Sequence, residues 1–237
     1  MEWKLDLHVH SDRSADGRMT LAEIIETAKS RGLSGVAICD HDAVMASVPS
    51  VPDFLIIPAT EVSTKQGHLL GLFVTEPVTA KDLPEAAAAI HAQGGIAVLA
   101  HPFQHNPDEN RLLPYLDSLD GIEVQNSRAN RKNKNANAQA KDFARLHHLL
   151  PFAGSDAHVP QEIGGSVTIV AAQSPEAVKA ALLSGAARTE GRSAKSRYVA
   201  MSQLTKRRKT NAGVLSYAKW SVFALKCCIE DLFRGNR

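Results

Sequence analysis

The chain contains 237 residues, 44% of them hydrophobic, and carries a formal net charge of +2. This length and composition allow one large core, so we expect one main domain. The three cysteines, Cys39, Cys227 and Cys228, have no zinc-finger spacing and two are adjacent, which argues against a disulfide framework and favours a reducing compartment. No charged start followed by an apolar run and a cleavage site is visible, so we expect a cytoplasmic protein.

The charges are unevenly distributed along the chain. Residues 192–237 contain eleven Lys or Arg and two acidic residues, a net charge of +9, which leaves −7 for residues 1–191. An acidic body favours cations, whereas a basic tail favours an anionic partner.

Apolar runs of strand length alternate with helical patterns through the first two thirds of the chain. In chain order we predict strand 5–10, a helix within 19–32, strands 35–42, 54–63 and 67–74, helix 81–93, strand 96–101, helix 109–119, strand 121–125, helix 135–146 and strand 150–155. This alternation favours a parallel sheet with helical crossovers, and about seven strands predict a barrel.

Three local features qualify this series. Thr20 and Glu23 have capping-box spacing at the start of the first helix, and Gly32 can end it. Residues 44–53 are too short and too rich in proline for a full helix, so the second unit is degenerate. His68 begins its strand rather than ending it, so it reaches the same rim as the other strand ends only if that strand runs opposite to its neighbour.

Potential metal ligands follow the downstream ends of the predicted strands. The set is His8, His10, Asp16, His41, Glu61, His68, His101, Asp156 and His158. His8 and His10 are two residues apart on a strand, so both rings emerge on the same side and can bind one ion. This pair taken alone is equally compatible with two histidines whose ring nitrogens are hydrogen-bonded inside a core. The full set of imidazoles and carboxylates favours zinc, manganese or iron over calcium or magnesium.

Six motifs occur in a fixed order along residues 5–170. They are HVH at 8–10, DHD at 40–42, the isolated Glu61, Gly67-His68, AHP at 100–102 and GSDAH at 154–158. Together they resemble the PHP (polymerase and histidinol phosphatase) family of metal-dependent phosphoesterases. The resemblance implies an α/β fold, a distorted (β/α)7 TIM-like barrel. We therefore expect residues 1–192 to form a PHP-type barrel domain, and residues 193–237 to form a basic linker and a C-terminal amphipathic helix.

The resemblance also implies a trinuclear centre that holds two or three divalent transition-metal ions, manganese, iron or zinc. The first ion would be held by His8, His10, Glu61 and Asp156. The second would share Glu61 and add His68 and His101. The third would be held by Asp16, His41 and His158. Longer family members insert a helical cap for which this chain has no room, so we expect an open site.

Such a centre predicts hydrolysis of a phosphoester. A water that bridges two dications loses its proton near neutral pH, and the resulting hydroxide attacks phosphorus while the ions spread the developing charge. We place the catalytic roles on Asp156, Glu61 and His158. The candidate contacts to the substrate phosphate follow strand ends in the sequence, and they are Arg13, Arg128, Arg131 and His105. Each of these is also compatible with an ordinary solvated surface residue.

The C-terminal segment adds an amphipathic helix over 214–233. One face carries Leu215, Ala218, Val222, Leu225, Ile229 and Phe233, but the segment has too many charges for a membrane span. We expect this face to pack on the barrel or on a partner subunit, with an anionic membrane surface as the alternative because Lys206-Arg207-Arg208-Lys209 precedes the helix.

Three functions are compatible with these patterns. The complete ligand set favours a phosphatase or phosphodiesterase that acts on a small phosphorylated metabolite or nucleotide. A nuclease that acts on nucleic acid ends gains support from the basic tail, although the tail lacks interleaved aromatic residues. A non-catalytic metal-binding module that attaches to a membrane or a partner protein is the third.

Overall fold

A nine-stranded sheet forms the body of the molecule in the computed structural model, which describes residues 1–234. The strands are β1 (Glu2–Val9), β2 (Gly35–Ile38), β3 (Leu55–Thr64), β4 (Gly67–Leu72), β5 (Ile96–Leu99), β6 (Gly121–Asn126), β7 (Leu150–Gly154), β8 (Ser166–Ala171) and β9 (Arg188–Gly191). The helices are α1 (Leu21–Ser30), α2 (Leu83–Ala92), α3 (Ala136–Leu146), α4 (Val178–Leu183), α5 (Ser196–Lys209) and α6 (Val214–Arg234). Three 3-10 helices, η1 (Asn110–Ser118), η2 (Ala129–Arg131) and η3 (Pro160–Glu162), complete the set.

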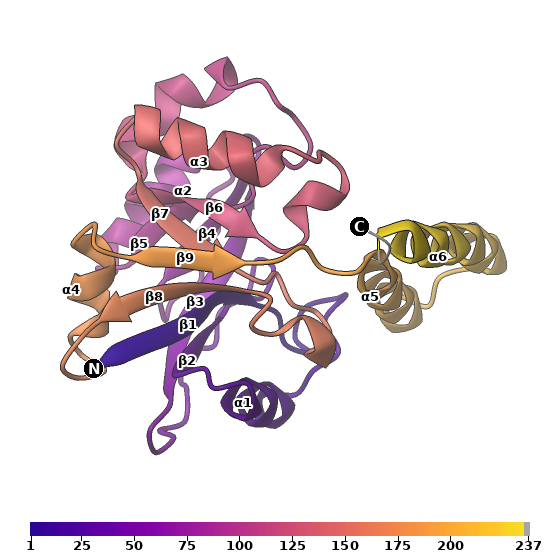
Figure 1. The fold of residues 1–237 in the computed structure, drawn as a ribbon, viewed down its shortest axis with the longest axis horizontal. Helices are drawn as coiled ribbons and strands as arrows, with labels where there is room; N and C mark the ends of the chain where they lie inside the picture. Colours follow the sequence, from indigo (N-terminus) through magenta and orange to yellow (C-terminus); the bar gives the residue numbers. More distant parts are fainter. Residues whose placement is uncertain (235–237) are drawn as a thin grey trace.

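The sheet curves into a nearly closed, barrel-like shape (Figure 1). The strand order is β7-β6-β5-β4-β3-β2-β1-β8-β9, and a parallel bridge between Val9 and Ala157 links the end of β1 to the segment after β7. Four neighbouring pairs are parallel, namely β1–β2, β2–β3, β5–β6 and β6–β7. Strand β4 runs antiparallel to β3 and to β5. The predicted barrel is therefore confirmed, and the reversed β4 is what His68 requires to reach the common rim.

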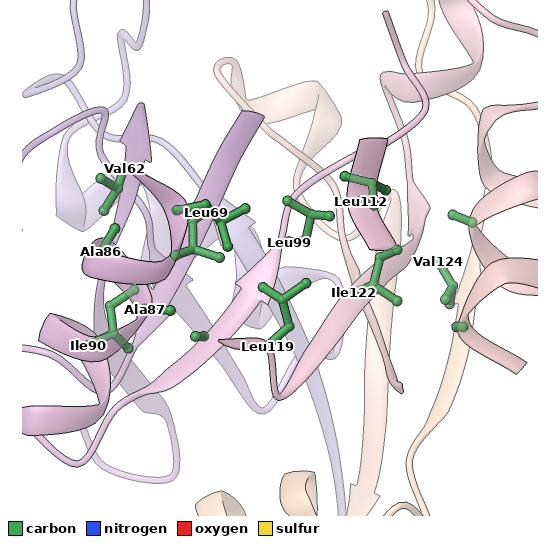
Figure 2. Close-up of a cluster of buried hydrophobic side chains, with 14 of the residues drawn as sticks. Val62, Leu69, Ala86, Ala87, Ile90, Leu99, Leu112, Leu119, Ile122 and Val124 are labelled. Carbon is green, nitrogen blue, oxygen red and sulfur yellow. The ribbon is translucent and has the colours of Figure 1, made fainter. Parts of the chain in front are cut away.

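Apolar side chains fill both sides of this sheet. Figure 2 shows one cluster in which Leu69, Leu99 and Ile122 from the strands meet Ile90 of α2 and Leu112 of η1. A second cluster takes buried residues from seven of the strands, including Leu5, Leu7, Ile57, Leu70, Val98 and Phe152. Each such side chain contributes about 1.5–3 kcal/mol through burial, so the rim of the barrel is held on a rigid support.

The C-terminal helices differ from the prediction over 193–209. The segment predicted as a linker forms α5, which packs against α6 beside the barrel (Figure 1). The indole Nε1 of Trp220 donates to the carbonyl of Ala200 at 2.8 Å, and the carboxylate of Asp231 accepts from the backbone N–H of Ser196 at 2.6 Å. The free N–H groups at the start of α5 are thus satisfied by α6, so tertiary contacts stabilise a segment that lacks an apolar periodicity of its own.

Two further expectations can be compared directly. The segment predicted as helix 109–119 is the 3-10 helix η1, which contains Pro114, a residue that cannot donate an α-helical hydrogen bond. Residues 44–53 contain no helix, as predicted. None of the helices within residues 1–234 is long and apolar enough to cross a membrane.

The capping box of α1 gives a testable stability prediction. The hydroxyl of Thr20 accepts from the backbone N–H of Glu23 at 3.2 Å, and the Glu23 carboxylate accepts from the Thr20 N–H at 2.8 Å. We expect Thr20→Ala to lower the free energy of unfolding by about 1 kcal/mol, measured by urea denaturation. Ser30→Ala, at the exposed other end of α1, is the matched control and should change it by less than about 0.5 kcal/mol. Equal effects of the two substitutions would contradict a role for the cap.

Candidate metal centre

All nine predicted ligand side chains meet at one rim of the barrel. They come from the end of β1 and the loop after it, from the loops after β2, β5 and β7, and from β3 and β4. We call this set, His8, His10, Asp16, His41, Glu61, His68, His101, Asp156 and His158, the nine-residue cluster. Three groups within it offer ligand atoms that all lie within 4.8 Å of one another. They are His8–His10–Asp156, His41–Glu61–His68 and His10–His41–His158.

Glu61 lies at the centre of the cluster and is buried. Its Oε1 lies 2.7 Å from Nδ1 of His68 and 3.0 Å from Nε2 of His101. Its Oε2 lies 2.9 Å from Nδ1 of His41 and 3.4 Å from Nε2 of His10. Despite these short distances, Oε2 accepts no hydrogen bond from the residues described. One carboxylate thus faces several imidazoles and keeps an oxygen free, which is the arrangement expected of a bridging metal ligand.

The protonation of three imidazoles is fixed by the groups behind them. His8 Nδ1 lies 2.9 Å from the Glu123 carboxylate, and His158 Nδ1 lies 2.9 Å from the backbone carbonyl of Asp156. His10 Nδ1 lies 3.2 Å from the hydroxyl of Ser14, which donates its own hydrogen to Asp40 at 2.7 Å. These groups act as acceptors, so each Nδ1 carries a hydrogen, which leaves Nε2 as the atom that can bind a metal ion.

The free lone pairs converge, which provides a test of whether a cation fits. The Nε2 atoms of His8 and His10 are 3.1 Å apart. Two lone pairs at this distance repel each other unless a proton or a cation lies between them. Asp16 Oδ1 is also buried without a hydrogen-bond partner among residues 1–234, and it lies 3.4 Å from Nε2 of His158 and 3.6 Å from Nε2 of His41. The donor set therefore fits divalent transition metals.

The electrostatics of the cluster favour charged carboxylates beside a neutral imidazole. Burial alone would raise the pKa of Glu61, but the charge of His8, the hydrogen bonds from His101 and His68 and the nearby imidazole of His41 outweigh it and hold that pKa well below its usual range. Burial lowers the pKa of His10 well below its usual value, and the neighbouring His158 adds to this effect. A neutral imidazole next to ionised carboxylates is the state that binds a metal ion.

Backbone geometry around the cluster is also unusual. His101 and Asp156 have positive φ angles of 28° and 56°, in the left-handed region that non-glycine residues rarely adopt. Strain of this kind is concentrated at functional sites. Gly154 precedes the second of these residues at the end of β7, where a Cβ atom would lie 2.3 Å from Cβ of His8. The glycine therefore lets β7 approach β1 closely enough to bring Asp156 to His8.

Comparison with known proteins agrees with this geometry. Residues 6–100 match the family model described as PHP domain, and residues 134–187 match the one described as PHP-associated. An uncharacterised protein of Methanocaldococcus jannaschii is 31% identical over 174 residues, which cover 69% of this chain and 68% of that protein. The chain belongs to the PHP family. A second uncharacterised protein of that organism is 30% identical over 142 residues, 52% of this chain and 82% of that protein.

Solved structures share the PHP fold at low sequence identity. A two-domain protein from Bacteroides vulgatus, described as containing a "predicted PHP-like metal-dependent phosphoesterase", superposes with a TM-score of 0.63 at 18% identity and covers 86% of this chain and 70% of its own. PsfC from Pseudomonas syringae has a TM-score of 0.62 at 18% identity, covering 87% of this chain and 98% of its own. An amidohydrolase from Chromobacterium violaceum, solved with bound sulfate and no metal, has a TM-score of 0.55 at 19% identity over 68% of this chain and 89% of its own. Family membership and the cluster together support a metal-dependent hydrolase.

The predicted substrate contacts of this PHP protein occupy different places. Arg13 is exposed and donates to the carbonyl of Val44, outside the pocket that contains the cluster. Arg128 lines that pocket, but both of its paired donors go to the buried Glu162, at 2.7 and 2.5 Å. Arg131 and His105 also line the pocket. Their contact with a phosphate remains a prediction.

Two residues of the PHP site, Lys132 and Glu123, were not identified from the sequence. Lys132 lines the pocket, and its Nζ lies 3.2 Å from Nδ1 of His105. Glu123 is buried, and it also accepts from the backbone N–H of His101 at 2.9 Å, so it connects two members of the cluster. Glu123 lies in the middle of predicted strand 121–125, where a carboxylate between Ile122 and Val124 was the available signal, but its partner His8 lies 115 residues away.

The C-terminal helices change the expected openness of the PHP site. Val199 and Gln203 of α5 line the pocket that contains the cluster. The Lys209 side chain, at the end of α5, donates to the carbonyls of Ser14 and Gly17 at 2.8 and 2.7 Å, on either side of Asp16. Helix α5 therefore forms one wall of the site and braces the loop that carries Asp16, so the rim is less open than expected.

Proposed function

We propose that the protein is a metal-dependent phosphoesterase that hydrolyses a phosphate ester of a small metabolite or nucleotide. The observation that carries the proposal is the convergence of the free Nε2 atoms of His8, His10 and His158 with the free carboxylate oxygens of Glu61 and Asp16. Two or three divalent ions would be held by the nine-residue cluster. When bound, such ions lower the pKa of water and neutralise charge on phosphate oxygens.

The residues of the chain supply orientation and binding. Glu123, Ser14 and the Asp156 carbonyl hold His8, His10 and His158 in the tautomer that presents Nε2. Lys132 and Arg131 bring positive charge to the same pocket. Cationic side chains at the mouth of a metal site fit a phosphorylated substrate, since they match the charge that the phosphate carries.

The size of the site supports a small substrate. The pocket over the cluster measures about 230 Å³. A neighbouring cleft of about 510 Å³ shares His68, His101 and His105 with it and is also lined by Arg111 and Tyr115. Small-molecule sites commonly measure about 300–1,000 Å³. The two spaces together accommodate a phosphate group at the cluster and a metabolite-sized or nucleotide-sized leaving group in the cleft.

A phosphoester panel tests the proposal. The full chain would be loaded with manganese, iron or zinc and assayed against sugar phosphates, nucleotides and short oligonucleotides. We expect metal-dependent release of phosphate from at least one small substrate, with activity lost on chelation and restored by the metal. Preferential cleavage of oligonucleotides, with a steep dependence on salt, would favour the nuclease alternative. Metal uptake with no hydrolysis of any phosphoester would favour a non-catalytic module.

A further inference from the structure

Helix α6 exposes an apolar stripe that the rest of the described chain leaves uncovered. The stripe consists of Val214, Leu215, Val222, Leu225, Ile229, Leu232 and Phe233, all exposed. Val222, Leu225 and Phe233 are 72%, 64% and 74% exposed. At 100° per residue these positions share one side of the helix, opposite the side where Trp220 and Cys227 meet α5 and the barrel. The predicted packing of this face on the barrel is therefore wrong, which leaves a partner subunit or a membrane surface as its expected occupant.

Within residues 1–234, this stripe is contiguous, unlike the other exposed apolar side chains. The remaining exposed large hydrophobic residues, Met1, Leu113, Leu146 and Leu183, lie singly on different elements. Scattered exposed apolar residues are normal, whereas a contiguous patch marks an interaction surface.

Most of the charges around the stripe are positive. Lys219 and Lys226 are exposed and lie seven residues apart, along one edge of the stripe. Asp231 faces α5, where it accepts from the start of that helix, whereas Glu230 lies beside the stripe and is paired with Arg131 at 3.6 Å. A groove of about 840 Å³ follows the stripe, with Lys134 of the barrel on its far side.

We propose that this surface docks α6 onto an anionic lipid bilayer. A helix with an apolar face and flanking lysines lies in the plane of the bilayer, with its apolar side chains among the acyl chains and its cations at the headgroups. A second copy of the chain is a poorer occupant, because pairing of two stripes would bring together two segments that each carry a net charge of +9 over residues 192–237. The proposal is independent of the metal centre.

Vesicle sedimentation of the full chain tests the proposal. We expect binding to vesicles made of equal parts phosphatidylcholine and phosphatidylglycerol, and binding at least about tenfold weaker to phosphatidylcholine alone. The double substitution Val222→Gln/Leu225→Gln should lower the partition coefficient by about tenfold or more. Lys219→Gln/Lys226→Gln should lower it by about fivefold per lysine on anionic vesicles and leave it unchanged on phosphatidylcholine.

Leu146→Gln is the matched control, because Leu146 is equally exposed but lies on α3, and it should bind as the unchanged chain does. Circular dichroism should show that the helical content is preserved in every variant, since the substituted side chains face solvent. Absence of binding to anionic vesicles would overturn the proposal, as would equal binding by Val222→Gln/Leu225→Gln. A dimer in light scattering that Val222→Gln/Leu225→Gln converts to a monomer would also overturn it and would assign the stripe to a second copy.

Discussion

Asp156→Asn is expected to lower turnover by about a thousandfold or more, because the loss of a charged ligand removes several kcal/mol of stabilisation from the reaction. The Asp156 carboxylate lies 3.5 Å from Nε2 of His10 and 3.9 Å from Nε2 of His8. Asparagine keeps the shape of the side chain and tolerates the left-handed backbone found at this position, so the fold should be preserved. Steady-state assays on the metal-loaded protein measure the effect.

A surface carboxylate provides the control for this substitution. Asp142 on α3 is 75% exposed, and Asp142→Asn should leave both turnover and metal content unchanged. If Asp156→Asn kept full turnover and its full complement of metal, the role assigned to this carboxylate would be refuted.

Glu123→Ala is expected to weaken metal binding by about 10–100-fold, since it removes the carboxylate that orients His8. Glu123→Gln should fall between Ala and the unchanged chain. An amide oxygen can still accept from His8 Nδ1, but the amide nitrogen then faces two other donors, the His101 N–H and the side chain of Asn126. Calorimetric titration of the metal-free chain measures the affinity.

Excess metal separates a positioning role from a structural one. Turnover of Glu123→Ala should recover as the metal concentration rises, because His8 itself is intact. Unchanged metal affinity in Glu123→Ala would contradict the role of Glu123, and a loss of turnover that metal cannot restore would indicate structural damage instead.

The sequence alone predicts the barrel and the members of the cluster because both depend on local order. Strand ends at one rim of a barrel bring residues such as His10, His41 and His101 together whatever the details of packing. The position of His68 at the start of its strand also carried information, since it required the reversal that β4 shows. Residues whose role depends on contacts with distant parts of the chain could not be predicted from such local patterns.

Several of the missed features share one physical cause. Helix α5 has few apolar residues, and its order comes from α6 and from the loop that Lys209 binds. Strand β9, Arg188–Gly191, has no apolar alternation and is ordered by pairing with β8. The sequence also could not predict whether the stripe on α6 faces the barrel or solvent. Amphipathic periodicity shows that an apolar face exists but not what covers it.

Metal content per chain, measured by mass spectrometry on protein purified and then reconstituted with excess manganese, iron or zinc, tests the central claim most directly. We expect two or three ions per chain, and fewer in His10→Ala, since Nε2 of His10 lies within 3.5 Å of His8, Glu61 and Asp156 ligand atoms. Less than one ion per chain under these conditions would contradict the assignment of the nine-residue cluster as a metal centre.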